Sequence, residues 1–321
     1  DFMKRQLLTS LFAFLLVFSL CMGCSKAETG DKTTASDSFE VSSQKTSPVK
    51  ITLNEVAHSV FYAPLYVAIE KGYFKDENID LTLVTGFGAD KTMTAVISGE
   101  ADIGFMGSEA SVYMYSEGAS DYVVNFAQLT QRAGNFLVAR QDNEHFQWAD
   151  LKGKTVLGGR KGGMPEMVFE YILKENGIDP EKDLTIIQNI DFGSTAPAFA
   201  DGRGDFTIEF EPGATSLESE GKGHVIASLG KDSGYVPYTA FSAKKSYLKE
   251  NPDVIQRFTN ALQKGMDYVR SHSPSETASV IKPQFPETTL EMITTIVTRY
   301  YEQDTWKSNL IFEESSFDLL Q

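Results

Sequence analysis

Two acidic residues beyond the middle of the chain have a spacing that could serve ligand binding. Glu209 and Glu211 lie two apart in a run predicted to be extended, so their carboxylates point to the same side. Two such carboxylates repel each other and are costly to bury without hydrogen-bond donors. Either one of them accepts a hydrogen bond from an NH or NH2 group of a ligand, or both lie on a solvated rim or pair with Arg160 or Lys161. The sequence leaves both alternatives open.

Five aromatic residues could hold a flat ring, since stacked aromatic pairs add roughly 0.5 to 1.5 kcal/mol beyond burial. They are Phe61, Tyr62, Phe87, Phe192 and Tyr238. Each of them could equally belong to the core. The competing hypothesis is an anionic ligand, held by helix N-termini at Ser108 and Ser194 with help from Arg160. Acidic residues outnumber basic ones at these loop ends, which disfavours an anion.

The sequence carries no signature of hydrolytic or metal-dependent catalysis. It has no Gly-x-Ser-x-Gly and no His-Glu-x-x-His motif, and its four His are widely scattered. The run at 158–163 (GGRKGG) invites comparison with a phosphate-binding loop but lacks the Gly-Lys-Ser/Thr ending of that motif. We interpret it as a flexible loop at the end of a strand. The sequence therefore predicts a non-enzyme without a cofactor or a metal ion.

Two similar stretches indicate that the chain repeats one structural unit. The stretches are 99–109 (GEADIGFMGSE) and 202–211 (GRGDFTIEFE), and a predicted helix ends at the Gly that opens each of them. Asp102 and Asp205 begin the strands that follow. Asp102 lies 51 residues after Ile51 and Asp205 lies 50 residues after Thr155, in the first predicted strand of each half. Two lobes of one design therefore account for the chain better than one large sheet.

The predicted strands and helices alternate, which implies parallel sheets with right-handed crossovers. Strands are predicted at 50–56, 80–85, 102–106, 122–129, 136–140, 154–158, 184–190 and 205–209. Helices are predicted at 64–72, 91–98, 109–116, 165–175 and 195–200, with another after Pro212 and more in the last third of the chain, where Asn251 and Ser273 mark helix starts.

Ligands of open α/β sheets bind beyond the carboxyl ends of the strands, so two facing lobes would present their loops to one cleft. From the first lobe we expect the ligand to meet His58, Ser59, Phe61, Tyr62, Phe87, Ser108 and Glu109. From the second lobe we expect Arg160, Lys161, Asp191, Phe192, Ser194, Glu209, Phe210 and Glu211, with Tyr238 completing the aromatic set.

The beginning of the chain predicts export and anchoring. Lys4 and Arg5 precede an apolar run at 7–20, the pattern of a signal peptide. Cys24 follows a small residue, as in a bacterial lipobox, although Cys21 stands where that motif usually has Leu. We expect residues up to Cys24 to be a lipoprotein signal peptide (1–24) with lipid on Cys24, and ordinary signal cleavage is the alternative.

The composition of the chain predicts a polar tether and limits the kinds of partner that the protein could bind. Residues 25–48 are too polar to bury much apolar surface, so we expect a disordered tether. The 321 residues carry a formal net charge of −15, which argues against nucleic acid or an anionic membrane surface as a partner.

Three segments are similar to hallmark segments of the NMT1/THI5-like periplasmic solute-binding proteins. They are Ala63–Ala68 (APLYVA), Lys71–Phe74 (KGYF) and Gly99–Gly104 (GEADIG). The resemblance implies an α/β fold of the periplasmic-binding-protein-like type II, with two lobes, a hinge and a ligand cleft between them. It implies that 49–140 and 236–321 form lobe 1 and that 141–235 form lobe 2, with crossings near Arg140 and within 235–241.

Members of that family serve ABC importers of thiamine pyrimidine precursors, riboflavin, taurine, alkanesulfonates or nitrate. We therefore expect an extracytoplasmic, monomeric receptor, anchored by lipid to the cell membrane of a bacterium. It would deliver a small planar nitrogen heterocycle to an ABC transporter permease. A small anion such as an alkanesulfonate or taurine is the alternative ligand.

The resemblance also raises an enzymatic alternative. Fungal relatives of this fold make the thiamine pyrimidine with a cysteine-rich motif and iron. The present chain has no Cys beyond position 24, which disfavours an enzyme. A module that contacts only other proteins is a third possibility.

Overall fold

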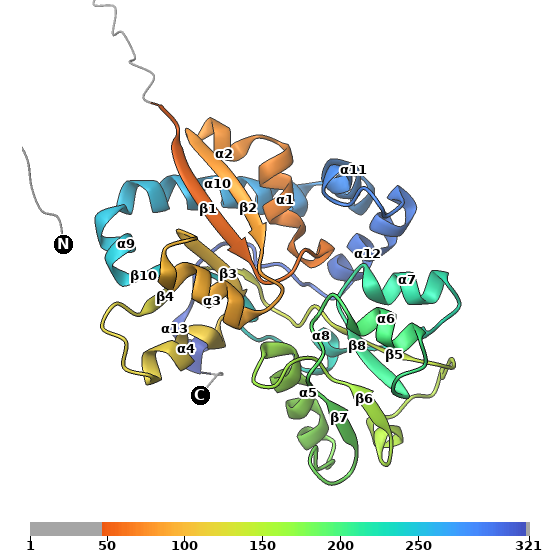
Figure 1. Cartoon of the computed structure of the whole chain (residues 1–321). Helices are drawn as coiled ribbons and strands as arrows, with labels where there is room; N and C mark the ends of the chain where they lie inside the picture. The colour runs from red at the N-terminus through yellow and green to blue at the C-terminus, as the bar shows by residue number, and fades with distance from the viewer. Residues whose placement is uncertain (1–46, 319–321) are drawn as a thin grey trace, which may run out of the picture. The chain divides into compact units, whose positions relative to one another are not determined.

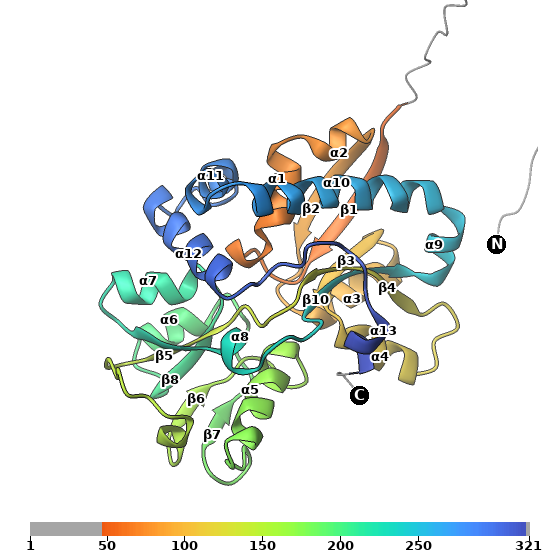
Figure 2. The ribbon, with the colours of Figure 1, turned by 180° about the vertical axis from the view of Figure 1, so that it is seen from behind.

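The computed structural model describes residues 47–318, which belong to one compact unit with two β-sheets. The first sheet has the strand order β2-β1-β3-β10-β4 and the second has the order β7-β6-β8-β5-β9. Helices cover both sheets (Figures 1 and 2). The expected fold of two α/β lobes is confirmed, with lobe 1 built around the first sheet and lobe 2 around the second. The expected signal peptide (1–24), the lipid on Cys24 and nearly all of the expected tether (25–48) lie outside the described residues.

Lobe 1 is made from two separate parts of the chain. The first part contains β1 (Val49–Glu55), the 3-10 helix η1 (Val60–Tyr62), α1 (Ala63–Glu70), α2 (Tyr73–Asp76), β2 (Ile79–Thr85), α3 (Ala89–Ser98), β3 (Ile103–Gly107), α4 (Glu109–Ser116) and β4 (Val123–Thr130). The second part contains β10 (Thr239–Lys244), α9 (Lys245–Glu250), α10 (Pro252–Ser271), α11 (Pro274–Ile281), the 3-10 helix η3 (Lys282–Gln284), α12 (Leu290–Glu302) and α13 (Glu314–Asp318).

Lobe 2 is continuous in the chain. It contains β5 (Phe136–Ala139), the 3-10 helix η2 (Trp148–Leu151), β6 (Thr155–Leu157), α5 (Met164–Glu175), β7 (Thr185–Ile187), α6 (Thr195–Ala200), β8 (Phe206–Glu209), α7 (Gly213–Ser219), β9 (His224–Ser228) and α8 (Leu229–Asp232).

The helices predicted at 64–72, 91–98, 109–116, 165–175 and 195–200 are present, with ends within two residues of those expected, and one predicted cap differs. Pro64 lies in the first turn of α1, and Gly72 after its end has φ 75°, a left-handed conformation that suits Gly. Ser273 opens α11 with a capping box, as its sequence indicates. Asn251 precedes α10, but its side chain caps no N–H group of the helix and instead donates to the carbonyl of Tyr247.

The two sheets share one design because each receives a strand from the chain after it has crossed between lobes. β5 pairs antiparallel with β8 and β9, and β10 pairs antiparallel with β3 and β4. The expected parallel pairing is confirmed for β1, β2 and β3 and for β6, β7 and β8. The antiparallel pairing of β5 and β10 was not expected, and it arises because each crossing strand enters its sheet in the opposite direction. The first crossing also lies before Phe136 rather than near Arg140, because 136–139 already pairs in the second sheet.

Asp102 and Asp205 occupy equivalent positions, as the repeated stretches predict. The Asp102 carboxylate accepts a hydrogen bond from the Thr52 N–H at 2.8 Å, and the Asp102 N–H donates to the Thr52 carbonyl at 2.9 Å. Asp205 makes the same pair with Thr155, at 2.8 and 2.7 Å. Each pair joins the start of the third strand of its lobe to the first, and so sets the register of β3 on β1 and of β8 on β6.

We predict that Asp102→Ala lowers the free energy of unfolding by about 1–2 kcal/mol, because the half-buried Thr52 N–H loses its acceptor. Asp102→Asn should cost less, since an amide oxygen can accept the same bond. Asp205→Ala is the matched change in lobe 2 and should also cost less, because water reaches this exposed position. Urea unfolding measures all three, and equal losses for Asp102→Ala and Asp102→Asn would contradict the prediction.

Candidate functional site

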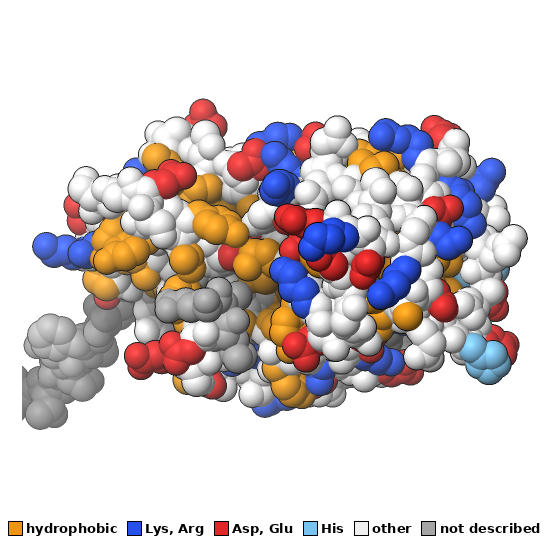
Figure 3. Space-filling view, turned by 90° about the horizontal axis from the view of Figure 1, so that it is seen from below, with side chains coloured by type: hydrophobic (Ala, Val, Ile, Leu, Met, Phe, Trp, Pro, Cys, Tyr) orange, Lys and Arg blue, Asp and Glu red, His pale blue; other side chains and the backbone are white. Residues whose placement is uncertain are grey.

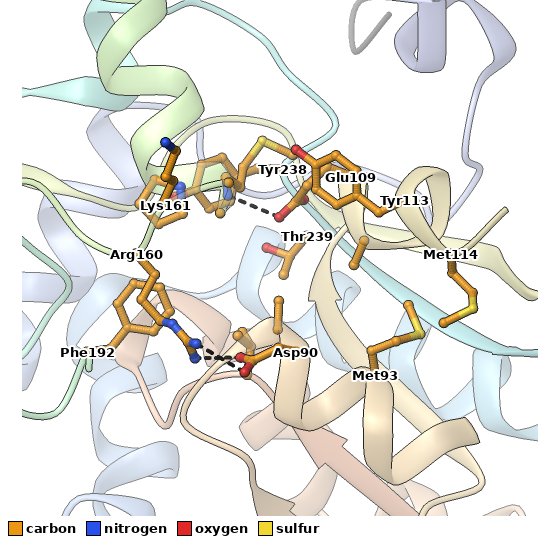
Figure 4. Close-up of a pocket in the computed structure, with 18 of the residues that line it drawn as sticks. Asp90, Met93, Glu109, Tyr113, Met114, Arg160, Lys161, Phe192, Tyr238 and Thr239 are labelled. Atoms are coloured by element: carbon orange, nitrogen blue, oxygen red, sulfur yellow. Dashed lines mark hydrogen bonds and ion pairs between the residues drawn. The ribbon is translucent and has the colours of Figure 1, made fainter. Parts of the chain in front are cut away.

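A cavity of about 460 Å³ lies between the lobes, where strands of both sheets end. Lobe 1 lines it with α3 and the junction of β3 and α4, and lobe 2 lines it with the loop after β6 and the start of α5. Figure 4 shows Arg160, Lys161 and Phe192 on one side of the cavity and Met93, Met114 and Tyr113 on the other. The residues that the sequence predicts and that line this cavity are Tyr62, Glu109, Arg160, Lys161, Phe192, Phe210 and Tyr238.

Aromatic side chains from both lobes form part of the cavity wall. Phe192 and Phe210 meet edge to face, with ring centroids 5.4 Å apart. Tyr62 and Tyr238 also line the cavity and are otherwise buried. The Tyr238 hydroxyl donates to the Asn135 side chain at 2.5 Å, so its proton is already engaged within the protein.

Glu109 is the first residue of α4 and is 4% exposed. Its Oε1 accepts a hydrogen bond from the Met164 N–H, 3.0 Å away at the start of α5, which connects lobe 1 to lobe 2. Its Oε2 has no hydrogen-bond partner among the described residues. Burial raises the pKa of Glu109 to about 7, an effect larger than the opposite effect of hydrogen bonds from its own N–H and from Met164. One oxygen of the buried Glu109 carboxylate can therefore accept a further hydrogen bond.

A smaller cavity of about 200 Å³ shares Phe192 and Phe210 with the first. The other predicted residues that line it are His58, Ser59, Phe87, Glu209 and Glu211. Glu209 is 3% exposed, and its carboxylate accepts hydrogen bonds from the hydroxyls of Thr195 at 2.9 Å and Thr207 at 2.5 Å. Burial raises the pKa of Glu209 to about 8 despite these two donors.

Glu211 belongs to a separate network that holds the lobes together. Its carboxylate accepts hydrogen bonds from the N–H and the hydroxyl of Thr215, both at 2.8 Å, and from Arg299 at 2.9 Å. Arg299 lies on α12 and also binds Glu218 at 2.6 Å. Neither a solvated rim nor a pair with a cation of the loop after β6 describes Glu211, because it is buried against an arginine 88 residues away in the chain.

His58 and Ser59 are both engaged by other parts of the protein. Nδ1 of His58 lies 2.7 Å from the Glu55 carboxylate, and Nε2 lies 2.9 Å from the Gln284 carbonyl. Burial lowers the pKa of His58, but the hydrogen bond and the charge of Glu55 raise it by more, so the pKa is raised overall. The Ser59 hydroxyl donates to the main-chain carbonyl of Glu211 at 2.5 Å, which is another contact between lobes.

Charged residues join the lobes at the rim of the larger cavity. Arg160 donates two hydrogen bonds to the Asp90 carboxylate, at 2.5 and 3.0 Å (Figure 4). Asp191 is exposed and lies 3.8 Å from the Lys91 ammonium and 3.9 Å from the Arg160 guanidinium. Asp191 therefore stands outside both cavities, as part of this charged rim.

Three more predicted residues line neither cavity. Phe61 is buried in an aromatic cluster with Tyr62, Phe210, Tyr238 and Tyr300. Ser108 is buried and its hydroxyl donates to the Pro237 carbonyl, so it holds the start of α4 to the chain that returns from lobe 2. Ser194 is exposed and its side chain caps no N–H group of α6.

The sequence interpretation missed part of the cavity wall. The residues missed include Asp90, Met93, Ile97, Tyr113, Met114 and Thr239. Ile97 and Tyr113 are 44% and 48% exposed. The sequence pattern that could have identified these residues is an apolar side chain on the outward face of a short helix. Figure 3 shows the molecule from below relative to Figure 1. Hydrophobic side chains gather over the half where α3 and α4 lie, and more charged side chains lie over the other half.

Two further properties concern residues 47–318 alone. No group of three or more His, Cys, Asp or Glu side chains in this range is placed to hold a metal ion. Within the same range every helix is too short or too polar to cross a membrane.

Comparison with known sequences identifies relatives over most of the chain. The profile of the family described as NMT1/THI5 like matches residues 60–276. YtlA of Bacillus subtilis (strain 168), which is named as a candidate binding protein, is 50% identical over 278 residues, which are 87% of this chain and 83% of that protein. The 4-amino-5-hydroxymethyl-2-methylpyrimidine phosphate synthase of Candida albicans (strain WO-1) is 23% identical over 232 residues, which are 66% of this chain and 64% of that enzyme.

Solved structures share the fold. The alkanesulfonate-binding protein SsuA from Xanthomonas axonopodis pv. citri, bound to MOPS, matches with a TM-score of 0.66 and 16% identity, over 79% of this chain and 84% of that chain. At this level of identity the likeness concerns the fold alone.

We predict that Glu209 makes the free energy of unfolding fall as pH rises from about 5 to 8. The unfolded chain loses this proton near the ordinary pKa of about 4.3, whereas the folded protein keeps it until about pH 8. The folded state therefore binds more protons in this window, and stability falls by at most about 1.4 kcal/mol per pH unit.

Glu209→Gln should reduce this slope, and Glu100→Gln, at an exposed position, is the matched control that should keep it. Urea unfolding at pH 5, 6, 7 and 8 measures the slopes. A Glu209→Gln protein whose stability falls as steeply as that of the wild type would show that the group does not titrate as described.

Proposed function

Because this chain belongs to the NMT1/THI5-like family, we propose that it is the solute-binding receptor of an ABC importer. Its ligand is a small, planar nitrogen heterocycle similar to a thiamine pyrimidine precursor, bound in the larger cavity between the lobes. The relative that is 50% identical over 87% of the chain is itself named as a candidate binding protein, which supports the receptor class.

The observation that carries the choice of ligand is the aromatic wall. Phe192 and Phe210 come from lobe 2, and Tyr62 comes from lobe 1, so rings face the cavity from both lobes. A volume of about 460 Å³ is within the range of small-molecule pockets, and flat ring systems gain most from such walls. The rings approach each other only when the lobes are together, so ligand binding favours the closed state.

The charges around the cavity favour the same ligand. The buried Glu109 carboxylate has an oxygen without a donor among the described residues, which favours a ligand that donates a hydrogen bond over an anion. Arg160 is already paired with Asp90.

A small anion such as taurine or an alkanesulfonate is the second candidate, and one observation favours it. Lys161 lines the cavity and has no ion pair among the described residues, so it could meet an anionic group. The alkanesulfonate-binding protein with the same fold makes this alternative worth testing. Pyrimidine synthesis, the activity named for the fungal relatives, is disfavoured because the sequence has no Cys after position 24.

The receptor role includes an anchor and a hinge. Lipid on Cys24 and the polar segment at 25–48 tether the protein outside the cytoplasm, where it delivers its ligand to a permease as a monomer. The segments 131–135 and 229–238, which connect β4 to β5 and β9 to β10, serve as the hinge on which the lobes open.

We predict that 4-amino-5-hydroxymethyl-2-methylpyrimidine raises the melting temperature of the protein and that taurine and alkanesulfonates do not. Binding to the folded state alone stabilises it by RT ln(1 + [L]/Kd). Phe192→Ala should weaken binding about tenfold because the ring loses a stacking surface. Tyr171→Ala removes an aromatic ring from lobe 2 that is 50% exposed and outside the cavity, so it should not change binding. Stabilisation by the sulfonates alone would overturn the choice of ligand and leave the receptor class standing.

A further inference from the structure

The buried carboxylate of Glu109 has an oxygen whose role the fold does not explain. Oε1 accepts the Met164 N–H at 3.0 Å, but Oε2 has no partner among residues 47–318 and is shielded from solvent. A buried acceptor without a donor destabilises the folded state, and does so more strongly when it is charged. Packing alone would be served better by an apolar side chain, so the unpaired oxygen points to a donor that the protein itself does not supply.

The carboxylate of Glu109 fits in its position because residue 107 is a glycine and has no side chain. Gly107 is the last residue of β3, and a Cβ built there would lie 2.1 Å from Oε2 and 2.5 Å from Oε1 of Glu109. A side chain at position 107 would therefore displace the carboxylate. The glycine and the glutamate together form a built position at the cavity, where Tyr113, Tyr238 and Thr239 are also part of the lining (Figure 4).

We infer that Oε2 of Glu109 accepts a hydrogen bond from an N–H group of the ligand, which makes Glu109 the residue that selects ligands with an amino group or a protonated ring nitrogen. This inference rests on the proposed function, because it takes the larger cavity as the ligand site. In its ionised form the Glu109 carboxylate only accepts hydrogen bonds, and it then rejects a ligand that presents only acceptors or an apolar edge, since no donor would be available.

The same group links recognition to closure. Glu109 belongs to lobe 1 and Met164 to lobe 2, so the hydrogen bond to Oε1 forms only when the lobes are together. Oε2 of the same carboxylate accepts the hydrogen bond from the ligand. Closure of the lobes buries the Glu109 carboxylate, which costs free energy. A ligand that donates a hydrogen bond to Oε2 offsets this cost. Ligands with the donor therefore stabilise the closed state more than ligands without it.

The test compares two probes on two proteins. The probes are 4-amino-5-hydroxymethyl-2-methylpyrimidine and 5-hydroxymethyl-2-methylpyrimidine, which lacks only the amino group. The wild type should bind the amino compound about 10- to 100-fold more tightly, as expected for a hydrogen bond to a buried charged acceptor. Glu109→Gln can still accept the Met164 N–H but presents an NH2 group at the position of Oε2, so this preference should disappear.

Isothermal titration calorimetry gives the four affinities, and their ratio isolates the contact between the amino group and Glu109. Glu100→Gln, at an exposed position after the end of α3, is the matched control and should keep the wild-type preference. The melting temperature of Glu109→Gln without ligand confirms that the variant is folded. As a second variant, Gly107→Ala should also lose the preference because it displaces the carboxylate.

The outcomes separate the two proposals. If the wild type prefers the amino compound and folded Glu109→Gln keeps that preference, the role of Glu109 is wrong and the pyrimidine receptor stands. If both proteins bind the two probes equally, the role of Glu109 is again wrong. If the wild type binds neither probe, the proposed ligand class fails, and the inference built on it fails too.

Discussion

Burial of carboxylates between the two lobes is the constraint on which the rest of this structure depends. Glu55, Glu109, Glu209 and Glu211 are each less than 5% exposed where strands of the two sheets end. A buried carboxylate is costly unless donors surround it. Side-chain donors surround Glu55 and Glu209, and Arg299 and Thr215 bind Glu211. Of these four, Glu109 is the one with an unpaired oxygen, and we propose that a donor of the ligand completes the set there.

The exchange of strands explains how these groups come to face each other. The chain leaves each lobe after its outermost strand and enters the other lobe antiparallel, beside the third strand. The connecting segments meet through main-chain hydrogen bonds, from Val236 N–H to the Gln131 carbonyl at 2.9 Å and from Leu229 N–H to the Asn135 carbonyl at 3.1 Å. In the proposed opening, rotation at these segments would leave both sheets intact and separate Glu109 from lobe 2.

Local patterns in the sequence were enough to predict most elements and the equivalence of Asp102 and Asp205, because helix ends and strand starts depend on neighbouring residues. The antiparallel entry of β5 and β10 was missed because strand order depends on pairings between distant segments. The partner of Glu211 was missed for the same reason, since Arg299 is 88 residues away. The unpaired oxygen of Glu109 could not be read from the sequence either, because it depends on how closely the two lobes meet.

The most direct test of this account is to identify the small molecule that the protein retains through native purification. The protein would be produced in a bacterial host, purified without unfolding and then denatured, and the released compounds would be identified by mass spectrometry. The account predicts a small, planar nitrogen heterocycle that carries an N–H donor. A retained sulfonate or another small anion would contradict it.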